Sequence, residues 1–179
     1  MDFSWPTKTI DELKSEAKAA IAMGPFGSRI KAENFVSEGV PVLKGGNLHG
    51  VFIDDTYCDF LTEEKANELK SSIARPGDIV ITHRGTLGQV SIIPEHSRYP
   101  KYIVSQSQLK ISLNRELINP LFVTYYLRSH IGQHELLSYS SQVGVPAIAK
   151  ASTSVRQLKI PCPEIETQNN VVRILSELV

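Results

Sequence analysis

Apolar residues recur at helical spacing near the start of the chain. They are separated by three or four positions and would share one face of a helix: Ile10, Leu13, Ala17, Ala20 and Ile21. Thr9 lies just before this run and Glu12 follows three positions later, which is the spacing of a capping box. We therefore expect a first helix that extends to about Met23, with Gly24 as a left-handed C-terminal cap and Pro25 preventing continuation.

A second stripe of this kind lies near the end of the chain. Its apolar members again share one helical face: Val171, Ile174, Leu175 and Leu178. Thr167 is the expected N-cap, because its hydroxyl can accept a hydrogen bond from a free amide of the first turn. An apolar stripe needs a partner, so this helix either packs back on the domain or is the first part of a longer helix that pairs elsewhere.

Between these ends, short apolar runs alternate with turn residues. We expect strands at residues 40–44, 78–82, 89–93, 102–104, 109–113 and 158–160, with a further apolar segment at 51–53. The glycine-bearing turn from His83 to Gly88 predicts a hairpin. Thr62 is the expected cap of a second helix that Pro76-Gly77 ends, and Asn119-Pro120 predicts the start of a third helix reaching about Leu137. Short strands at uneven spacing among helices favour a single α+β domain with a curved mixed β-sheet and flanking helices.

Composition narrows the class of protein. The 179 residues are 41% hydrophobic and carry no net charge, which suits one buried core and gives no overall attraction to a polyanion. Residues 51–70 are nevertheless acidic, whereas 75–110 and 128–160 are basic, a distribution that an ordinary solvated surface would also explain. Cys58 and Cys162 lack metal-ligand spacing, and no apolar run approaches a membrane span, so we expect a soluble cytoplasmic protein that does not enter a membrane.

No convincing active site is visible. His130 and His134 have the spacing of two zinc ligands on a helix, but Ile131 occupies the position at which the zinc-protease motif needs glutamate. Asp78 begins a strand like the first acidic residue of some metal-dependent nucleases, yet the second carboxylate and the lysine are missing. We therefore expect no catalytic residue, no metal and no cofactor.

The loops instead carry side chains suited to DNA recognition. Arg84 follows His83 in a glycine hairpin, and arginine can read guanine with two hydrogen bonds, although an exposed arginine in a turn has the same pattern. Lys44 and Asn47 flank two glycines, where lysine could bind phosphate and asparagine could pair with adenine or simply favour the turn. The remaining candidate DNA-binding residues also lie in or beside loops: Ser28, Arg29, Lys31, Gln106, Gln142, Lys150 and Arg156.

The order of these segments resembles one target recognition domain of the DNA specificity subunits of type I restriction-modification enzymes. The similar segments, in order, are Gly24-Pro25-Phe26-Gly27-Ser28, residues 39–47, residues 76–88, Gly144-Val145-Pro146-Ala147-Ile148 and Ile160-Pro161-Cys162-Pro163 with Gln168. The last segment resembles the entry into the family's spacer helix, but Cys162, Glu164 and Thr167 depart from the residues usual there.

The resemblance implies that residues 1–163 form the DNA recognition domain and that residues 164–179 begin the coiled-coil spacer helix. Its implied function is to read one half of a bipartite duplex DNA site and to direct the methyltransferase (modification) and restriction subunits, without catalysis of its own. A second recognition domain, in the same chain or in a dimer mate, would read the other half. Two alternatives stay open, namely a protein-interaction domain that associates through the C-terminal helix and a degenerate metal-dependent nuclease.

Overall fold

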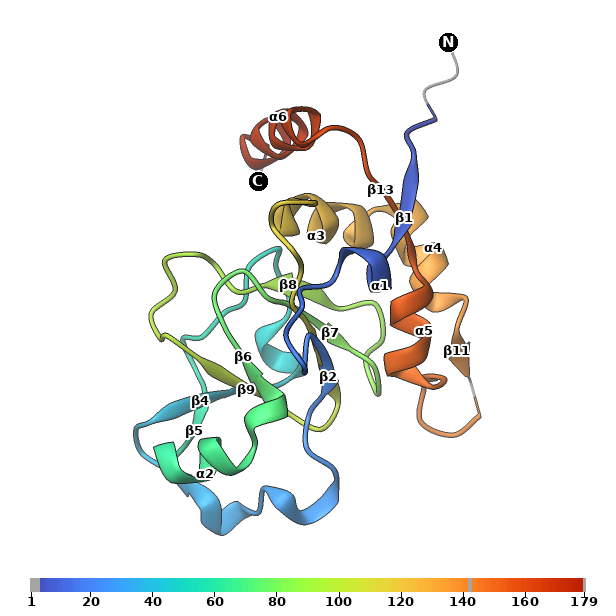
Figure 1. Cartoon of the computed structure of the whole chain (residues 1–179). Coiled ribbons are helices and arrows are strands. Elements are labelled where there is room, and N and C mark those ends of the chain that lie inside the picture. Colours follow the sequence, from blue (N-terminus) through green and yellow to red (C-terminus); the bar gives the residue numbers. More distant parts are fainter. Residues whose placement is uncertain (1–3, 142, 179) are drawn as a thin grey trace.

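The computed structural model describes residues 4–141 and 143–178. Two sheets form most of the body of the protein (Figure 1). The four-stranded sheet is antiparallel, in the order β2 (Ile21–Met23), β10 (Gln108–Ile111), β7 (Ile79–Thr82) and β8 (Val90–Ile92). The five-stranded sheet is mixed, since β4 and β9 are parallel, in the order β3 (Phe35–Val36), β5 (Asp59–Leu61), β4 (Val40–Leu43), β9 (Tyr102–Val104) and β6 (Ile73–Ala74).

Two small antiparallel pairs and six helices complete the described chain. The pairs are β1 (Thr7–Thr9) with β13 (Lys159–Pro161) and β11 (Ser140–Ser141) with β12 (Ala147–Ile148). The helices are α1 (Ile10–Leu13), α2 (Glu63–Glu68), α3 (Pro120–Arg128), α4 (His130–Leu137), α5 (Ala151–Gln157) and α6 (Ile165–Ser176). Short 3-10 turns occupy Gly27–Arg29, Ala32–Asn34, Gly45–Asn47 and Lys70–Ser72. The predicted α+β class is confirmed, with the strands shared among several sheets.

The core lies on both faces of the four-stranded sheet. Ile79 and Ile81 of β7 belong to the large cluster that includes Phe122 of α3 and Val155 of α5. Val80 points the other way, into a second cluster shared with the five-stranded sheet. Because successive side chains of a strand alternate between the two faces, a strand buried on both faces reads as a continuous apolar run.

The predicted hairpin and most predicted strands are confirmed. Strands β7 and β8 pair with Ile79 opposite Ile92, and Gly85 and Gly88 in the turn between them have φ of +97° and +90°. At such angles a side chain would be strained, which explains both glycines. Segment 51–53 forms no strand, although Phe52 makes an isolated parallel bridge to Ile92.

The long first helix was a wrong prediction. The capping box is present, with the Glu12 amide donating to Thr9 Oγ1 at 3.2 Å and the Thr9 amide donating to Glu12 Oε2 at 2.7 Å, but the helix ends at Leu13. Residues 21–23 instead form β2, which pairs with β10. A strand partner supplies hydrogen bonds and burial that the local helical pattern does not reveal, so tertiary pairing overrides it.

Gly24 has a different role from the predicted left-handed cap. It is not among the glycines with positive φ, so its backbone does not need glycine for that reason. A Cβ atom at Gly24 would lie 1.9 Å from the Ser105 carbonyl oxygen. The residue is therefore required by the close approach of two backbones.

Two other helices end earlier than predicted. Thr62 caps α2 as expected, but the helix stops at Glu68 and β6 follows before Pro76. The predicted third helix is divided at Ser129, whose hydroxyl accepts from the Gly132 amide at 3.2 Å and so caps α4. A serine with an extended backbone can end one helix and start another, because its side chain replaces the missing intrahelical partner.

The C-terminal helix docks on the domain by its first turns. It begins at Ile165, with Glu164 at the N-cap position, so the prediction of Thr167 as the cap was wrong. Gln168 is fully buried, its Oε1 accepts from the Asn119 amide at 2.8 Å and its Nε2 donates to the Pro163 carbonyl at 2.8 Å. Val171 and Val172 pack against the core, whereas Ile174 and Leu178 are 52% and 78% exposed.

Candidate nucleic-acid interface

Three loops meet at His83, at the end of the hairpin strand β7. The His83 amide donates to the Ser107 carbonyl at 2.9 Å, and its carbonyl accepts from the Ile148 amide at 2.8 Å. The ring Nε2 lies 3.1 Å from the Gln106 carbonyl oxygen. His83 therefore fixes the hairpin turn against the 105–107 turn on one side and the β12 segment on the other.

The surroundings of the His83 ring favour its neutral form. Burial is the main cause that lowers its pKa, and the neighbouring Arg84 guanidinium lowers it further. The ring is therefore neutral near pH 7. Because a carbonyl oxygen only accepts hydrogen bonds, Nε2 carries the proton and Nδ1 is left as an acceptor.

A buried polar network supports these loops from below. Thr82 Oγ1 donates to Gln89 Oε1 at 2.7 Å, and Gln89 Nε2 donates to the Gly45 carbonyl at 2.9 Å. Gln108 Nε2 donates to Thr82 Oγ1 at 3.2 Å, while the Ser105 hydroxyl bonds to Gln108 Oε1. The network joins the 45–47 turn, the hairpin and the 105–107 turn, and a satisfied buried network of this kind makes a surface rigid.

Arg84 and Lys150 supply exposed positive charge beside this meeting point. Both side chains are exposed, and no ion pair involves either of them within the described ranges 4–141 and 143–178. Arg84 makes an isolated antiparallel bridge with Ala147, and Lys150 lies three residues further on, at a φ of +47°. The structure therefore brings together two candidates that are 66 positions apart in the sequence. Candidate Gln142 lies outside the described residues.

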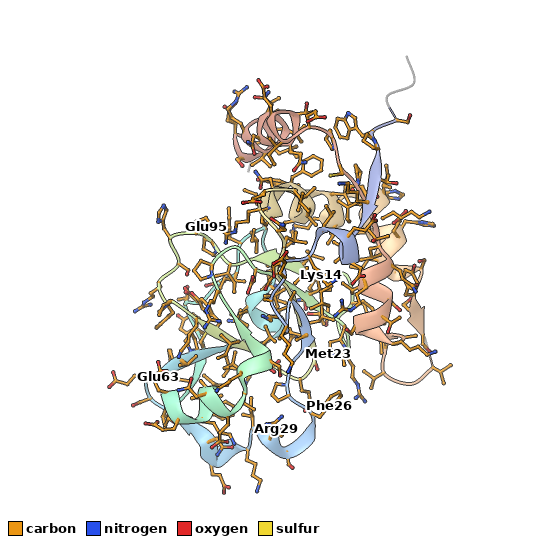
Figure 2. The ribbon with its side chains drawn as sticks, viewed as in Figure 1. Lys14, Met23, Phe26, Arg29, Glu63 and Glu95 are labelled. Atoms are coloured by element: carbon orange, nitrogen blue, oxygen red, sulfur yellow. The ribbon has the colours of Figure 1, made fainter. Side chains whose placement is uncertain are left out.

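The loop after β2 extends the same surface. A cavity of about 160 Å³ separates this loop from Gln106 and is lined by Pro25, Gly27, Ile30, Phe35, Val42, Lys44, Ser105 and Gln106. Figure 2 shows Phe26 and Arg29 at the end of the molecule opposite α6, and Phe26 is 75% exposed. Ser28 is exposed as well. Arg29 donates to the Glu68 carbonyl at 3.2 Å, and Lys31 Nζ lies 3.9 Å from Glu33 Oε1, so both cations reach the surface with weak internal contacts.

Two predicted contact residues are engaged inside the protein. Asn47 is 7% exposed, and its two amide hydrogens serve the carbonyls of Asp54 at 2.8 Å and Tyr57 at 3.1 Å. No donor remains for an adenine edge, so Asn47 stabilises the turn instead. Arg156 Nη1 lies 2.7 Å from Asp11 Oδ1 and joins α5 to α1. Hydrogen bonds from Lys14 and then from Arg156 lower the pKa of the Asp11 carboxyl.

Lys44 is half exposed and shared between two internal partners. Its ammonium group forms an ion pair with Asp59 and lies 5.0 Å from the centre of the Phe35 ring. A phosphate at this position would compete with the Asp59 carboxylate. Lys44 therefore lies at the rim of the surface that His83, Arg84 and Lys150 define.

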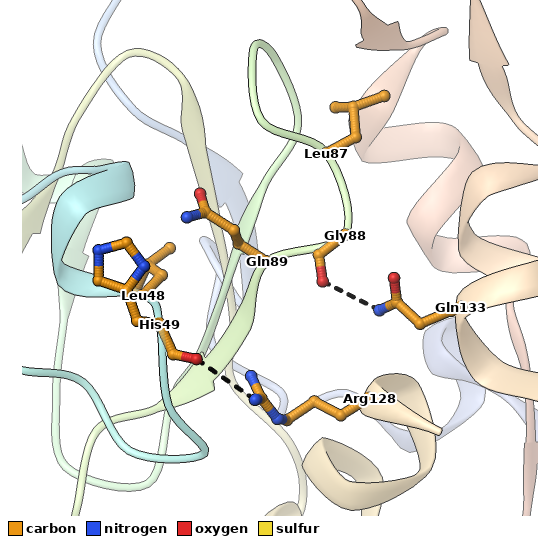
Figure 3. Close-up of a pocket in the computed structure, with 7 residues that line it drawn as sticks. All are labelled: Leu48, His49, Leu87, Gly88, Gln89, Arg128 and Gln133. Atoms are coloured by element: carbon orange, nitrogen blue, oxygen red, sulfur yellow. Dashed lines mark hydrogen bonds between the residues drawn. The ribbon is translucent and has the colours of Figure 1, made fainter. Parts of the chain in front are cut away.

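Behind the hairpin, α3 and α4 hold the turn in place. Figure 3 shows Arg128 and Gln133 facing a cavity of about 360 Å³ lined by Leu48, His49, Leu87, Gly88, Gln89, Arg128 and Gln133. Arg128 Nη1 donates to the carbonyls of Val90 at 2.7 Å and Gly50 at 3.0 Å, and Gln133 Nε2 donates to the Gly88 carbonyl at 2.9 Å. The polar groups that line this cavity are thus used to hold the hairpin in position.

Sequence reasoning did not identify the supporting residues. Thr82, Gln89 and Gln108 are polar residues in or next to otherwise apolar strands, and that interruption was the available signal. A polar side chain inside a buried strand must find a partner, so several of them in separate strands suggest a shared network. Arg128 and Gln133 gave no comparable signal, because polar residues on a helix usually face solvent.

Asp78, the acidic residue at the start of the β7 segment, is buried. Asp78 is 8% exposed, its Oδ2 accepts from the Arg75 amide at 2.8 Å, and burial raises its pKa. Within residues 4–141 and 143–178, no three His, Cys, Asp or Glu side chains gather as a metal site would require. No helix in these described ranges has the length and apolar character needed to cross a bilayer.

Two curated proteins of similar sequence are specificity subunits of type I restriction enzymes. The chain is 24% identical over 140 residues to the putative type I restriction enzyme MjaX specificity subunit of Methanocaldococcus jannaschii, covering 78% of this chain and 33% of that protein. It is 24% identical over 146 residues to the type I restriction enzyme EcoBI specificity subunit of Escherichia coli, covering 80% of this chain and 29% of that protein. The chain thus spans about a third of the length of these curated relatives.

Solved structures show the same fold. The HsdS subunit from Thermoanaerobacter tengcongensis superposes with a TM-score of 0.63 at 16% identity, over 99% of this chain and 37% of that one. A type I restriction-modification S subunit from M. genitalium gives 0.64 at 17% identity, over 98% and 39%. The family model for the type I restriction modification DNA specificity domain matches residues 26–179. The chain therefore belongs to the type I restriction modification DNA specificity domain family.

Proposed function

We propose that this chain recognises one half of a bipartite duplex DNA site on behalf of a type I restriction-modification enzyme. The observation that carries the proposal is the convergence of three loops at His83, with the exposed cations Arg84 and Lys150 beside them. Family membership supports a role in DNA sequence specificity. Rigid loops that present donors and cations suit this role, because base contacts specify a sequence while phosphate contacts position the protein.

The proposed contacts divide by chemistry. Arg84 would read a guanine through N7 and O6. The His83 Nδ1 would accept from a neighbouring base edge, and the Gln106 amide would accept from or donate to another. Lys150, Arg29 and Lys31 would bind phosphates, with Ser28 and Lys44 at the rim. Asn47 and Arg156 are left out, because their side chains are engaged in internal contacts.

The wider assembly is part of the same proposal. We assign residues 1–163 to DNA recognition and 164–179 to the beginning of a spacer helix, with methyltransferase and restriction subunits as partners and no catalytic role for this chain. A second recognition domain would read the other half-site. The support is the family, the coverage of only about a third of each curated relative, and the position of α6 over α3, at the other end of the molecule from the loop after β2 (Figure 1). We expect a cytoplasmic location, where such an enzyme meets DNA.

The test is selection of bound duplexes from a randomised pool at low salt, followed by sequencing. We expect enrichment of a motif of about three or four base pairs by the original protein and loss of preference at one of those positions in Arg84→Ala, at a cost of roughly 1–3 kcal/mol. Lys8→Ala is the matched control, because Lys8 is an exposed cation on β1. Equal motifs from all three proteins would remove Arg84 from the site, and no motif from the original protein would contradict the function.

A second candidate function rests on α6. Ile174 on α6 and Leu178, two positions after its end, are exposed, whereas Val171 and Val172 pack against the core. The exposed apolar residues favour association with another helix. If the chain were only an interaction domain, it would associate in sedimentation experiments without selecting any DNA. Replacing Ile174 and Leu178 by serine would then abolish association and leave the fold intact.

A further inference from the structure

The ribbon formed by β11 and β12 ends in an apolar tip beside the basic hairpin. Val143 is 90% exposed and Val145 is 56% exposed. Gly144 lies between them with a φ of +77°, and no heavy atom lies within 4 Å of the position that a Cβ atom would take there. The tip therefore projects into open space with two valine side chains.

The base of this tip is held firmly. The Gly85 amide donates to the Pro146 carbonyl at 2.8 Å, and the Ile148 amide donates to the His83 carbonyl at 2.8 Å. The Ala149 amide also donates to the Tyr139 carbonyl at 2.9 Å. The valines are thus carried on a ribbon that is fixed to the hairpin of Arg84, and their exposure is a property of an anchored segment.

The position of the tip indicates what it meets. Arg84 makes a backbone bridge to Ala147 in the ribbon, and Lys150 lies two positions after the end of β12, so two cations belong to the segments at the base of the tip. A hydrophobic protein partner would have to cover these charges, whereas duplex DNA offers both phosphates and an apolar group. The major groove admits a two-stranded ribbon, and its one apolar base feature is the C5-methyl group of thymine.

We propose that Val143 and Val145 contact thymine C5-methyl groups in the major groove, next to the base pair read by Arg84. This inference rests on the proposed function and adds a class of base to it. The half-site would contain thymine at one or two positions beside a guanine. Because a methyl–valine contact removes apolar surface from water, each buried methyl group should change binding roughly fourfold.

The test uses two randomised duplex pools that differ only in methyl groups. One pool is synthesised with thymine and the other with deoxyuridine, which has the same hydrogen-bonding groups and lacks the C5-methyl. The original protein should enrich a thymine-containing motif from the first pool and enrich the corresponding uracil motif roughly fourfold less per contacted position. The variant Val143→Ser/Val145→Ser should enrich both pools equally, because it removes the apolar methyl groups that would contact thymine.

Leu178→Ser is the matched control, because Leu178 is a 78% exposed apolar residue that lies two positions after the end of α6. It should keep the preference for the thymine pool, and circular dichroism of every variant checks that folding is unchanged. Two results would overturn the inference and leave the proposed function standing. One is equal enrichment of one motif from both pools by the original protein, and the other is a motif without thymine. No enrichment from either pool would contradict both.

Discussion

Gln168 is the residue whose removal should weaken the attachment of α6 most. Its side chain is fully buried and bridges two parts of the chain, accepting from the Asn119 amide and donating to the Pro163 carbonyl, each at 2.8 Å. Gln168→Ala leaves one backbone donor and one backbone acceptor without partners. A buried unsatisfied group costs about 1–3 kcal/mol, and water that enters the vacated volume recovers part of this. We therefore expect a loss of about 2–4 kcal/mol in the free energy of unfolding.

The assay is urea denaturation followed by circular dichroism, with the midpoint converted by the measured slope. For a slope of about 2 kcal/mol per molar urea, the midpoint should fall by about 1–2 M. Asn169→Ala is the matched control, because that side chain is exposed and makes one hydrogen bond, at 2.8 Å, to Asn119 Nδ2. It should cost less than about 1 kcal/mol. Equal midpoints for the two variants would refute the reasoning that the buried bridge anchors α6.

Three further outcomes are expected. Lys150→Ala should reduce the slope of log affinity against log salt by about 0.9 and keep the preferred motif, whereas Arg84→Ala should relax the motif. Binding titrations at several salt concentrations, on duplexes with and without the motif, distinguish the two effects. Burial lowers the pKa of His83, so below about pH 6.5 the unfolded chain binds more protons than the folded chain, and stability should rise with pH up to that value and then level off. His83→Gln should flatten this rise, which urea titrations between about pH 5 and 8 would measure. Gly24→Ala should destabilise the fold by about 3 kcal/mol, because its Cβ would lie 1.9 Å from a backbone carbonyl oxygen. Gly46→Ala should leave the thermal unfolding temperature nearly unchanged, because no heavy atom lies within 4 Å of the place that its Cβ would take.

The parts of the fold that could be predicted are those that short-range chemistry decides. The hairpin of β7 and β8 follows from two apolar runs and a turn with glycines at positive φ. The Asn119 cap with proline at the first helical position starts α3 as expected. In each case the residues that determine the structure lie within a few positions of one another, so the sequence pattern contains the whole cause.

The failures arise where a distant segment decides. Residues 21–23 have helical spacing but pair with β10, whose residues lie about 90 positions away. Gly24 has the sequence pattern of a helix cap, but its lack of a side chain permits the close approach of the Ser105 backbone. Such contacts depend on the topology of the sheets, which no local pattern specifies.

The candidate site shows the same division. Arg84 could be proposed from its hairpin, and its exposure agrees with that proposal. Asn47 could also be proposed, but its amide is used by carbonyls seven and ten residues further along the chain. The role of His83 in joining three loops follows only from the folded arrangement, because its partners lie at residues 106, 107 and 148.

The central claim is that the loops around His83, at a distance from α6, are the surface that binds DNA. Hydrogen–deuterium exchange of the whole chain, with and without the randomised duplex pool at low salt, tests it most directly. The account predicts slower exchange on DNA binding in residues 26–31, 83–88, 105–107 and 143–150, with α6 unchanged. Protection confined to α6, or spread evenly over the surface, would contradict it.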